Sequence, residues 1–245
     1  MEWMTITLEM YRRVFARAAT LTAKNWPVLG SIFAYWALLT GANLLLVALG
    51  VFGGPLALVG GVALNILRAA CFGSFLYLVE MMVQTGRVSL DDFKRSFGVY
   101  LWDVVGVMFV FWVIFMVLTP ILTQMPQGWT YLALLNLVLF IFFNAIPELI
   151  YLGHFSSLAL LSESYKFIGS NWIEWFPATV LAGLFMYAVL RVPGLGSVPF
   201  LQDAIIYLLL YFAMVLRGLL FLELYNSSYR SRAFRYRAGA KEARR

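Results

Sequence analysis

The side chains in this sequence that could do chemistry are a few polar residues inside long apolar runs. The candidates are Arg68, Glu80, Asn144, Glu148, His154, Arg217 and Glu223. A charge within an apolar run is costly, so it is expected to be paired or functional. Two arginines against one carboxylate would leave a surplus positive charge that suits a phosphate or carboxylate headgroup. The alternative is that these residues neutralise one another and fix helix packing.

The spacing allows two arrangements of these charges. In the first, Arg68 and Glu148 occupy equivalent positions, because a glycine and a phenylalanine follow both at the same offsets. Arg217 occupies a comparable position, which predicts an Arg–Glu–Arg cluster about a pseudo-threefold axis. In the second, Glu80 corresponds to Glu148, since each lies nine residues before a serine. Tryptophan spacing favours the second arrangement, and the sequence alone does not decide between them.

The fourth apolar run should be the most irregular. Pro147 is expected to kink it and to free the carbonyl one turn earlier. Asn144 and Glu148 flank this kink, so it is the first location to examine for a site. His154, the only histidine, lies one to two turns after Glu148, where it could either transfer a proton or simply pack at a helix end.

The sequence contains no motif that is typical of a familiar enzyme class. The sequence contains no P-loop, no Gly-x-Gly-x-x-Gly and no His-Glu-x-x-His. Cys71 is the single cysteine, so neither an intrachain disulfide nor a cysteine metal cluster can form. We therefore expect a protein that is not an enzyme and that has no metal and no cofactor.

The elements that carry these residues are apolar and long. Of the 245 residues, 62% are hydrophobic and only 12% are charged, whereas soluble domains carry about 25% charged residues. Six runs reach the roughly 20 residues that a membrane-spanning helix needs. They cover about 26–50, 55–84, 102–122, 130–156, 175–192 and 201–226. The predicted fold class is all-α, a polytopic membrane bundle of about six transmembrane helices.

Glycine and proline link these runs into hairpins, and the basic residues lie on one side of them. Gly53-Gly54-Pro55 joins the first two runs, and similar short links join the third to the fourth and the fifth to the sixth. Nearly all of the 18 lysines and arginines lie in the other flanking segments. By the positive-inside rule, both termini are cytoplasmic. The positive charge follows the membrane segments, so nucleic acid is not an expected partner.

A repeated layout indicates three hairpins, each introduced by an interfacial helix. In each, a polar, partly amphipathic stretch is followed by a tryptophan and then by an odd-numbered run. The tryptophans are Trp26, Trp102 and Trp172, and an asparagine precedes the first and the third. Indole prefers the boundary between headgroups and acyl chains, so these residues are expected to be interfacial anchors.

The first amphipathic stretch covers about 5–24. Its predicted membrane face consists of Leu8, Tyr11, Phe15, Ala18 and Leu21, with Arg12, Arg13 and Arg17 toward the other side. Such a helix can lie among anionic headgroups. The C-terminal segment 227–245 interleaves arginines with aromatic residues and is expected to lie on the membrane as a basic cytoplasmic tail. Gly60, Gly61 and Gly73 in the second run would permit close helix approach.

Two short motifs carry a resemblance to known proteins. Ser164-Tyr165-Lys166 followed by Asn171-Trp172, and the parallel Lys24-Asn25-Trp26, each precede a span. With six spans, this layout resembles bacterial inner-membrane protein families, and in particular the membrane domain attached to some glycerophosphodiester phosphodiesterases. No phosphodiesterase domain is present here, so no catalytic residue carries over. The resemblance implies a multi-pass protein of the bacterial cytoplasmic membrane with a link to lipids.

The sequence is compatible with two functions for this membrane protein. The sequence predicts one membrane domain, residues 1–226, followed by the basic tail. The absence of motifs and of a sizeable extramembrane domain favours a non-enzymatic membrane subunit or scaffold that packs against other membrane proteins. The alternative is a protein that handles or transports lipids or other amphiphiles through the charged residues of the even-numbered spans. Membrane lipids, especially those with anionic headgroups, are the expected partners in either case.

Overall fold

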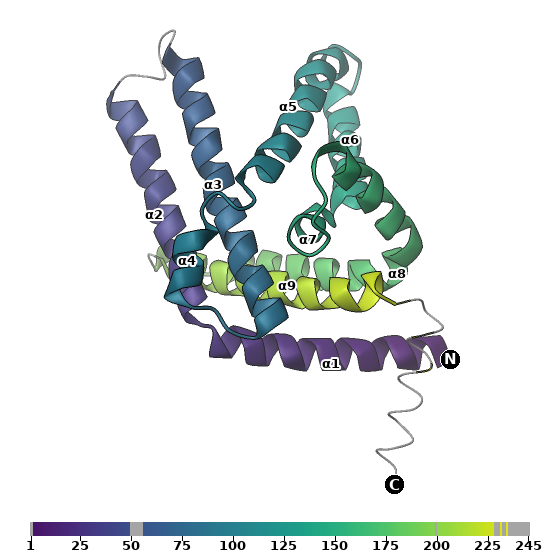
Figure 1. The fold of residues 1–245 in the computed structure, drawn as a ribbon. Coiled ribbons are helices and arrows are strands. Elements are labelled where there is room, and N and C mark those ends of the chain that lie inside the picture. Colours follow the sequence, from purple (N-terminus) through teal and green to yellow (C-terminus); the bar gives the residue numbers. More distant parts are fainter. Residues whose placement is uncertain (1, 50–55, 199, 228–230, 232–233, 235–245) are drawn as a thin grey trace. The chain divides into compact units, whose positions relative to one another are not determined.

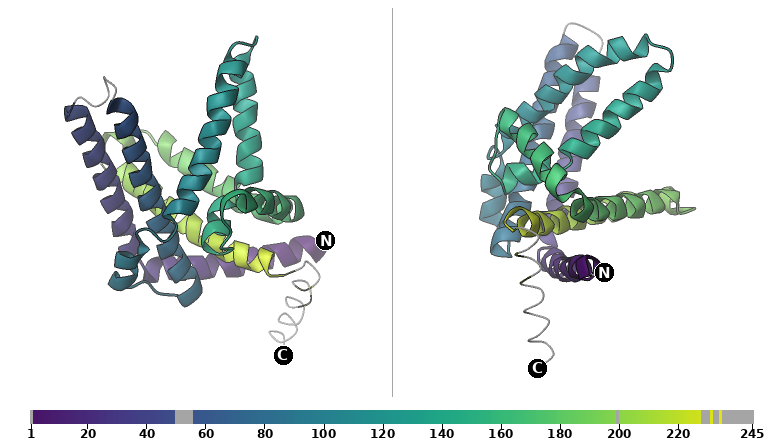
Figure 2. Two further views of the ribbon diagram at one scale, coloured as in Figure 1. Left: turned by 45° about the horizontal axis from the view of Figure 1, so that its top comes forward. Right: turned by 90° about the vertical axis from the view of Figure 1, so that its right-hand side faces the viewer.

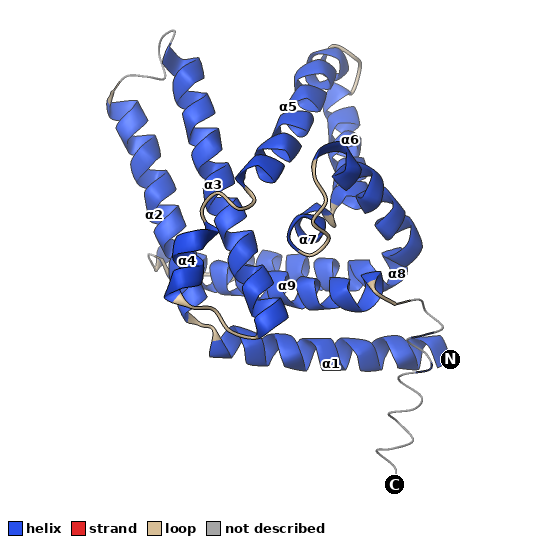
Figure 3. Cartoon of the chain, in the orientation of Figure 1, coloured by secondary structure: helices blue, strands red, loops and turns tan. Residues whose placement is uncertain are grey.

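The computed structural model describes residues 2–49, 56–198, 200–227, 231 and 234. Helices and loops are the elements in this described part of the chain (Figures 1 and 3). The helices are α1 Glu2–Lys24, α2 Pro27–Ala48, α3 Leu56–Thr85, α4 Leu90–Ser96, α5 Leu101–Thr123, α6 Gly128–Phe143, α7 Ile146–Tyr151, α8 Ser157–Arg191 and α9 Leu201–Tyr225, with a 3₁₀ turn at Leu195–Ser197.

Six segments are long and apolar enough to cross a membrane. They are α2, α3, α5, the α6–α7 pair, α8 and α9. Each corresponds to one of the six runs predicted from the sequence, and most boundaries agree within about two residues. The chain is therefore a multi-pass membrane protein with an all-helical bundle fold.

The chain divides into two compact units, which we describe separately. Unit 1 comprises Met1–Leu29, Met81–Arg87 and Ser170–Arg245. Unit 2 comprises Gly30–Glu80 and Val88–Gly169. Three of the spans, α2, α3 and α8, contribute residues to both units.

In unit 1, α1 packs along α9, and the two helices lie side by side in both views (Figures 1 and 2). The ring of Phe15 meets that of Phe212 edge to face, with centroids 5.1 Å apart. The Tyr11 hydroxyl ties α1 to α8, because it donates to the Glu174 carbonyl at 2.7 Å and accepts from the Ala178 N–H at 3.3 Å. These contacts fix α1, α8 and α9 relative to one another.

The prediction of the face that α1 presents is only partly correct. The buried face consists of Ile6, Met10, Val14, Ala18 and Leu21. Ala18 and Leu21 were expected on the membrane face but are buried within the protein. Leu8 and Phe15, by contrast, are 72% and 55% exposed. The helix has two apolar faces, one buried and one exposed, because membrane proteins meet apolar surroundings on both sides.

The first and third repeats differ at their asparagine–tryptophan pairs. Pro27 follows Trp26 directly, so α1 ends at Lys24 and α2 begins at the proline, which suits the first turn of a helix. Ile173 follows Trp172, and α8 therefore continues without a break from Ser157 to Arg191. A separate interfacial helix before the fifth span was expected, and the structure shows one continuous helix instead. At 1.5 Å per residue this helix is roughly 50 Å long, so it extends well beyond a bilayer core of about 30 Å.

The asparagine of the first repeat closes the elbow between α1 and α2. Asn25 Nδ2 donates to the carbonyls of Leu21 and Gly86 at 2.9 and 3.3 Å. The Asn25 carbonyl accepts from the Tyr211 hydroxyl at 2.9 Å. The elbow thus joins α1, the end of α3 and α9 within unit 1.

In unit 2, a chain of hydroxyls joins α2, α3 and α4. Tyr35 and Ser74 hydrogen-bond at 2.6 Å, Ser74 in turn bonds Ser96, and Ser96 donates to the Phe93 carbonyl. The α4 helix begins with a capping box in which Ser89 and Asp92 bond each other's backbone N–H. The hydrogen bonds from Ser89 lower the pKa of the Asp92 carboxyl. Asp91 and Asp92 lie in the first turn of this helix, where negative charge is favourable.

Spans α5 and α6 form an antiparallel hairpin in unit 2 (Figure 2). The predicted irregularity of the fourth run is also confirmed, because α6 ends at Phe143 and α7 begins at Ile146, just before Pro147. The Ser164 hydroxyl donates to the Phe142 carbonyl at 2.8 Å, which satisfies a backbone acceptor at this break.

Two sequence predictions fall on residues outside the described ranges. The first concerns the arginines of the predicted basic tail, from Arg230 onward. All of them lie outside the described residues, since positions 231 and 234 are a serine and a phenylalanine. The Gly53-Gly54-Pro55 link is the other.

Candidate functional site

The seven predicted site residues are divided between the two units. Arg217 and Glu223 belong to unit 1, and the other five belong to unit 2. An Arg–Glu–Arg cluster about one axis would need residues from both, so that arrangement stays a prediction. Within each unit the positions of these side chains can be compared directly.

Unit 2 brings Glu80 and His154 together. The Glu80 carboxylate is 5% exposed and accepts a hydrogen bond from the Tyr100 hydroxyl at 2.5 Å. His154 Nε2 lies 3.9 Å from its other oxygen. Gly73 lets the backbone of Tyr100 approach α3 closely, because a Cβ at Gly73 would lie 3.2 Å from the Tyr100 backbone. Burial, together with the hydrogen bond to Glu80, raises the pKa of the Tyr100 phenol, so the hydroxyl remains a donor.

Arg68, Asn144 and Glu148 are the remaining candidates of unit 2. Arg68 is exposed and donates to Asn65 on its own helix at 3.3 Å. Glu148 is fully buried in α7. Asn144 is buried at the helix break and lines a shallow hollow of about 270 Å³ with Asn136 and aromatic residues of α5 and α6. In unit 2, then, Arg68 is bound to Asn65 rather than to a carboxylate.

In unit 1, Arg217 lies over the ring of Trp175, with its guanidinium carbon 5.0 Å from the ring centroid. Trp175 is fully buried, and a cation over an indole face is stabilised by the ring quadrupole. Glu223 lies half-buried near the end of α9. Arg217 therefore contacts Trp175 within unit 1. The predicted anchors Trp26, Trp102 and Trp172 are all exposed.

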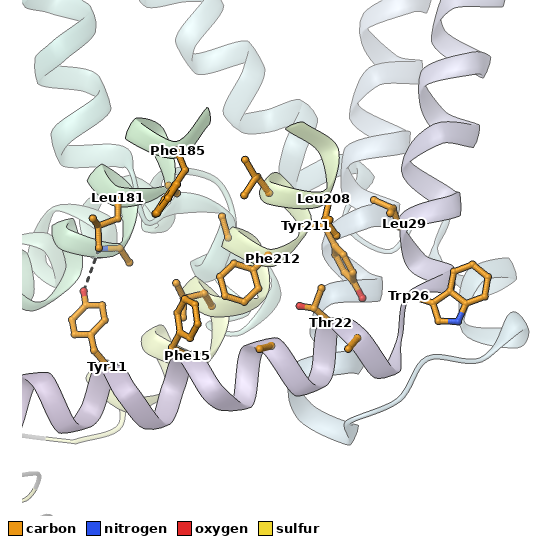
Figure 4. A pocket seen from close by; sticks show the side chains of 17 residues that line it. Tyr11, Phe15, Thr22, Trp26, Leu29, Leu181, Phe185, Leu208, Tyr211 and Phe212 are labelled. Atoms are coloured by element: carbon orange, nitrogen blue, oxygen red, sulfur yellow. Dashed lines mark hydrogen bonds between the residues drawn. The ribbon is translucent and has the colours of Figure 1, made fainter. Parts of the chain in front are cut away.

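Unit 1 also contains a cavity of about 590 Å³ between α1, α8 and α9 (Figure 4). Its walls are almost entirely hydrocarbon, and they include several aromatic rings. Those rings belong to Tyr11, Phe15, Trp26, Phe185, Tyr211 and Phe212. Figure 4 shows the side chains of Phe15 and Phe212 close together, with Phe185 on the α8 side. A cavity of this kind favours an apolar ligand.

The sequence did not identify this cavity, and Trp26 is the one lining residue among its candidate site and anchor residues. The sequence predicts a site at the intramembrane charges, whereas no charged residue lines this cavity. A usable signal exists on α1, where Leu8, Tyr11, Phe15, Ala19 and Trp26 form a second apolar stripe. The stripe cannot be recognised as a cavity wall until α8 and α9 are placed against it.

Polar atoms in the cavity wall are few, and two of them are committed to other helices. The Tyr11 hydroxyl binds the α8 backbone, as described above. The Tyr211 hydroxyl contacts the Asn25 carbonyl at 2.9 Å and Met82 Sδ at 3.1 Å. Thr22 Oγ1 is buried and has no hydrogen-bond partner. The Thr22 hydroxyl, unlike those of Tyr11 and Tyr211, is therefore available to hydrogen-bond a ligand.

Neither a metal centre nor a known relative explains these features. No group of three or more histidine, cysteine or carboxylate residues that could hold a metal ion occurs in the described part of the chain. Comparison with protein-family models, with curated proteins and with solved structures gives no match. The function must therefore be inferred from the side chains themselves.

Proposed function

We propose that this protein is a non-enzymatic lipid-handling protein of the membrane that binds an acyl chain in the cavity of unit 1. The single observation that carries the proposal is the cavity of about 590 Å³ between α1, α8 and α9. Small-molecule sites are typically clefts of roughly 300–1,000 Å³ with mainly apolar walls and a few polar groups. The unit 1 cavity has that size and that composition.

An acyl chain is the apolar ligand that a membrane supplies in greatest abundance. The exposed apolar stripe of α1 leads along the helix from Leu8 through Phe15 to Trp26, and the last two of these line the cavity. If α1 lies in the headgroup region, this stripe faces the acyl chains of the surrounding lipids. A chain could then enter the cavity without passing through water.

The basic residues of α1 favour an anionic headgroup on that lipid. Arg12, Arg17 and Lys24 are exposed, and a basic residue near a membrane surface contributes about 1 kcal/mol of attraction to anionic lipid. Arg13 is partly neutralised by Glu9, which it contacts at 2.9 Å. With the positive-inside pattern and the architectural resemblance, this supports the bacterial cytoplasmic membrane as the location, with both termini in the cytoplasm.

Photocrosslinking tests the proposal. The protein would be placed in nanodiscs of phosphatidylcholine containing a trace of phosphatidylglycerol with a diazirine at the end of one acyl chain. We expect cross-links on the lining segments of α1, α8 and α9 that excess unlabelled phosphatidylglycerol competes away. Cross-links on the exposed face of α5, for example at Trp112, report bulk lipid and should compete only by dilution.

Ala182→Phe fills the cavity and should reduce the cavity cross-links severalfold, because Ala182 lines its wall. Ala133→Phe adds the same bulk on exposed α6 and should change nothing. Thermal unfolding of both variants checks that they are folded. The wild-type protein alone can also refute the proposal. It does so if unlabelled phosphatidylglycerol reduces the cavity cross-links no more than it reduces those on α5.

A membrane subunit or scaffold is the second candidate, and the exposure of α5 favours it. Only 6% of the most apolar window of this span is buried within the protein, which leaves an aromatic-rich surface for another membrane protein. Purification in native membrane discs with mass spectrometry separates the two functions. A stoichiometric protein partner that Trp112→Ala releases would support the scaffold.

A further inference from the structure

The buried hydroxyl of Thr22 gives the cavity wall a polar point. Thr22 is 8% exposed and lines the cavity from α1, and its Oγ1 has no hydrogen-bond partner. In Figure 4 its side chain rises from α1 toward the space bounded by Tyr211 and Phe212. Buried hydroxyls are almost always hydrogen-bonded, and leaving one unpaired is unfavourable. The walls do not supply that partner.

Building on the lipid-binding function proposed above, we infer that the ligand is an acyl ester, and that its ester carbonyl accepts a hydrogen bond from the Thr22 hydroxyl. An ester carbonyl is the polar atom joined directly to an acyl chain. A chain that lies against the apolar walls can therefore bring this acceptor to the Thr22 hydroxyl. The threonine hydroxyl has one hydrogen to donate, and the pairing satisfies the group that the protein leaves unmatched.

The depth of Thr22 agrees with this assignment. Thr22 lies one turn before Trp26, the predicted anchor at the elbow between α1 and α2. Indole rings concentrate at the boundary between headgroups and acyl chains. The ester groups of glycerolipids lie at that same boundary, so a lipid whose chain enters the cavity would hold its carbonyl near the level of Thr22.

The same hydroxyl predicts discrimination between lipids. An ether lipid with the same chains and headgroup has no carbonyl oxygen, and its ether oxygen is a weaker acceptor. It fills the apolar walls equally well but leaves Thr22 poorly matched. One hydrogen bond contributes about 1 kcal/mol, which corresponds to roughly a fivefold preference for the ester lipid.

The test is a competition experiment with the diazirine phosphatidylglycerol probe in nanodiscs. Unlabelled diester and diether phosphatidylglycerols of identical chain length compete for the cavity cross-links. We expect the diester to compete about fivefold better against the wild-type protein. Thr22→Val keeps the side-chain shape and removes the hydroxyl, so the two competitors should become equal. Thr22→Ser keeps the hydroxyl and should retain the preference.

The outcomes separate this inference from the function on which it rests. Equal competition by diester and diether lipids against the wild-type protein overturns the ester assignment, while acyl-chain binding stands; the Thr22 hydroxyl would then be satisfied by water. A preference that persists in Thr22→Val also overturns the role of Thr22. If neither lipid competes for the cavity cross-links, the proposed function itself fails.

Discussion

At the scale of single residues, tyrosine hydroxyls join helices that the chain places far apart. Tyr35 and Tyr100 do so in unit 2, and Tyr11 and Tyr211 do so in unit 1. Tyrosine suits this role because its ring packs against apolar neighbours while its hydroxyl reaches a specific acceptor. Several of the polar contacts that fix tertiary structure in this bundle therefore come from neutral residues rather than from charged pairs.

Tyr100→Phe should destabilise unit 2 by about 1–3 kcal/mol, because it leaves the buried Glu80 carboxylate without its hydroxyl donor. Thermal unfolding in detergent would measure the change. Tyr131→Phe is the matched control, since Tyr131 is 41% exposed and the same atom is removed. If Tyr100→Phe and Tyr131→Phe unfold at the same temperature, this hydrogen bond contributes nothing to stability.

Because the phenol of Tyr11 is buried, we expect the folded protein to lose stability in alkali. Burial is the main reason that the pKa of its phenol rises from 10.0 to about 12. Between these values the unfolded chain releases the proton while the folded one keeps it, so the free energy of unfolding falls as pH rises. The contribution is fully present below pH 10.0. Tyr11→Phe should show a smaller decline between pH 10 and 12 in chemical unfolding experiments, and an unchanged slope would contradict the argument.

At the scale of elements, the two asparagine–tryptophan pairs show how one neighbouring residue decides a boundary. Pro27 stops α1 and starts α2, whereas the isoleucine after Trp172 lets α8 continue. Asn25 consequently lies in an elbow with three separate segments around it, while Asn171 lies within a regular helix. The same dipeptide therefore has different structural roles.

Asn25→Ala should destabilise the protein by about 1–3 kcal/mol, because the Leu21 and Gly86 carbonyls lose a buried donor. Asn171→Ala, on a partly exposed helical position, should change stability by about 0.5 kcal/mol or less. Denaturant or thermal unfolding in the same detergent compares the two. Equal effects would mean that the two pairs are equivalent after all.

At the scale of the whole molecule, six candidate spans make this a multi-pass membrane protein. The basic residues before α2 and between α3 and α5 predict, by the positive-inside rule, that both termini are cytoplasmic. The orientation decides which leaflet supplies lipid to α1, and hence which headgroups meet its arginines. It therefore bears directly on the proposed function.

Cysteine labelling would test the orientation. Asp91→Cys lies on exposed α4, and Gln124→Cys lies in the exposed link between α5 and α6. A membrane-impermeant maleimide applied to spheroplasts should label Gln124→Cys at once, but Asp91→Cys only after permeabilisation. The native Cys71 is buried and should contribute little background. The opposite labelling pattern would invert the topology.

The sequence alone determined the features that depend on neighbouring residues. Six spans follow from apolar length, and the break before α7 follows from Pro147. Each is a local consequence of hydrophobicity or of a missing backbone N–H. The fold class and the irregular point in the fourth span could both be predicted for this reason.

Only the tertiary structure decided which apolar surfaces meet. Leu8 and Leu21 look alike in the sequence, yet the first is exposed and the second is buried. In water, exposure to solvent would select polar residues and mark the difference, but lipid is as apolar as a protein core. The cavity walls come from segments on α1, α8 and α9 that are far apart in the sequence. Its shape, and the unmatched hydroxyl of Thr22, exist only once those helices pack together.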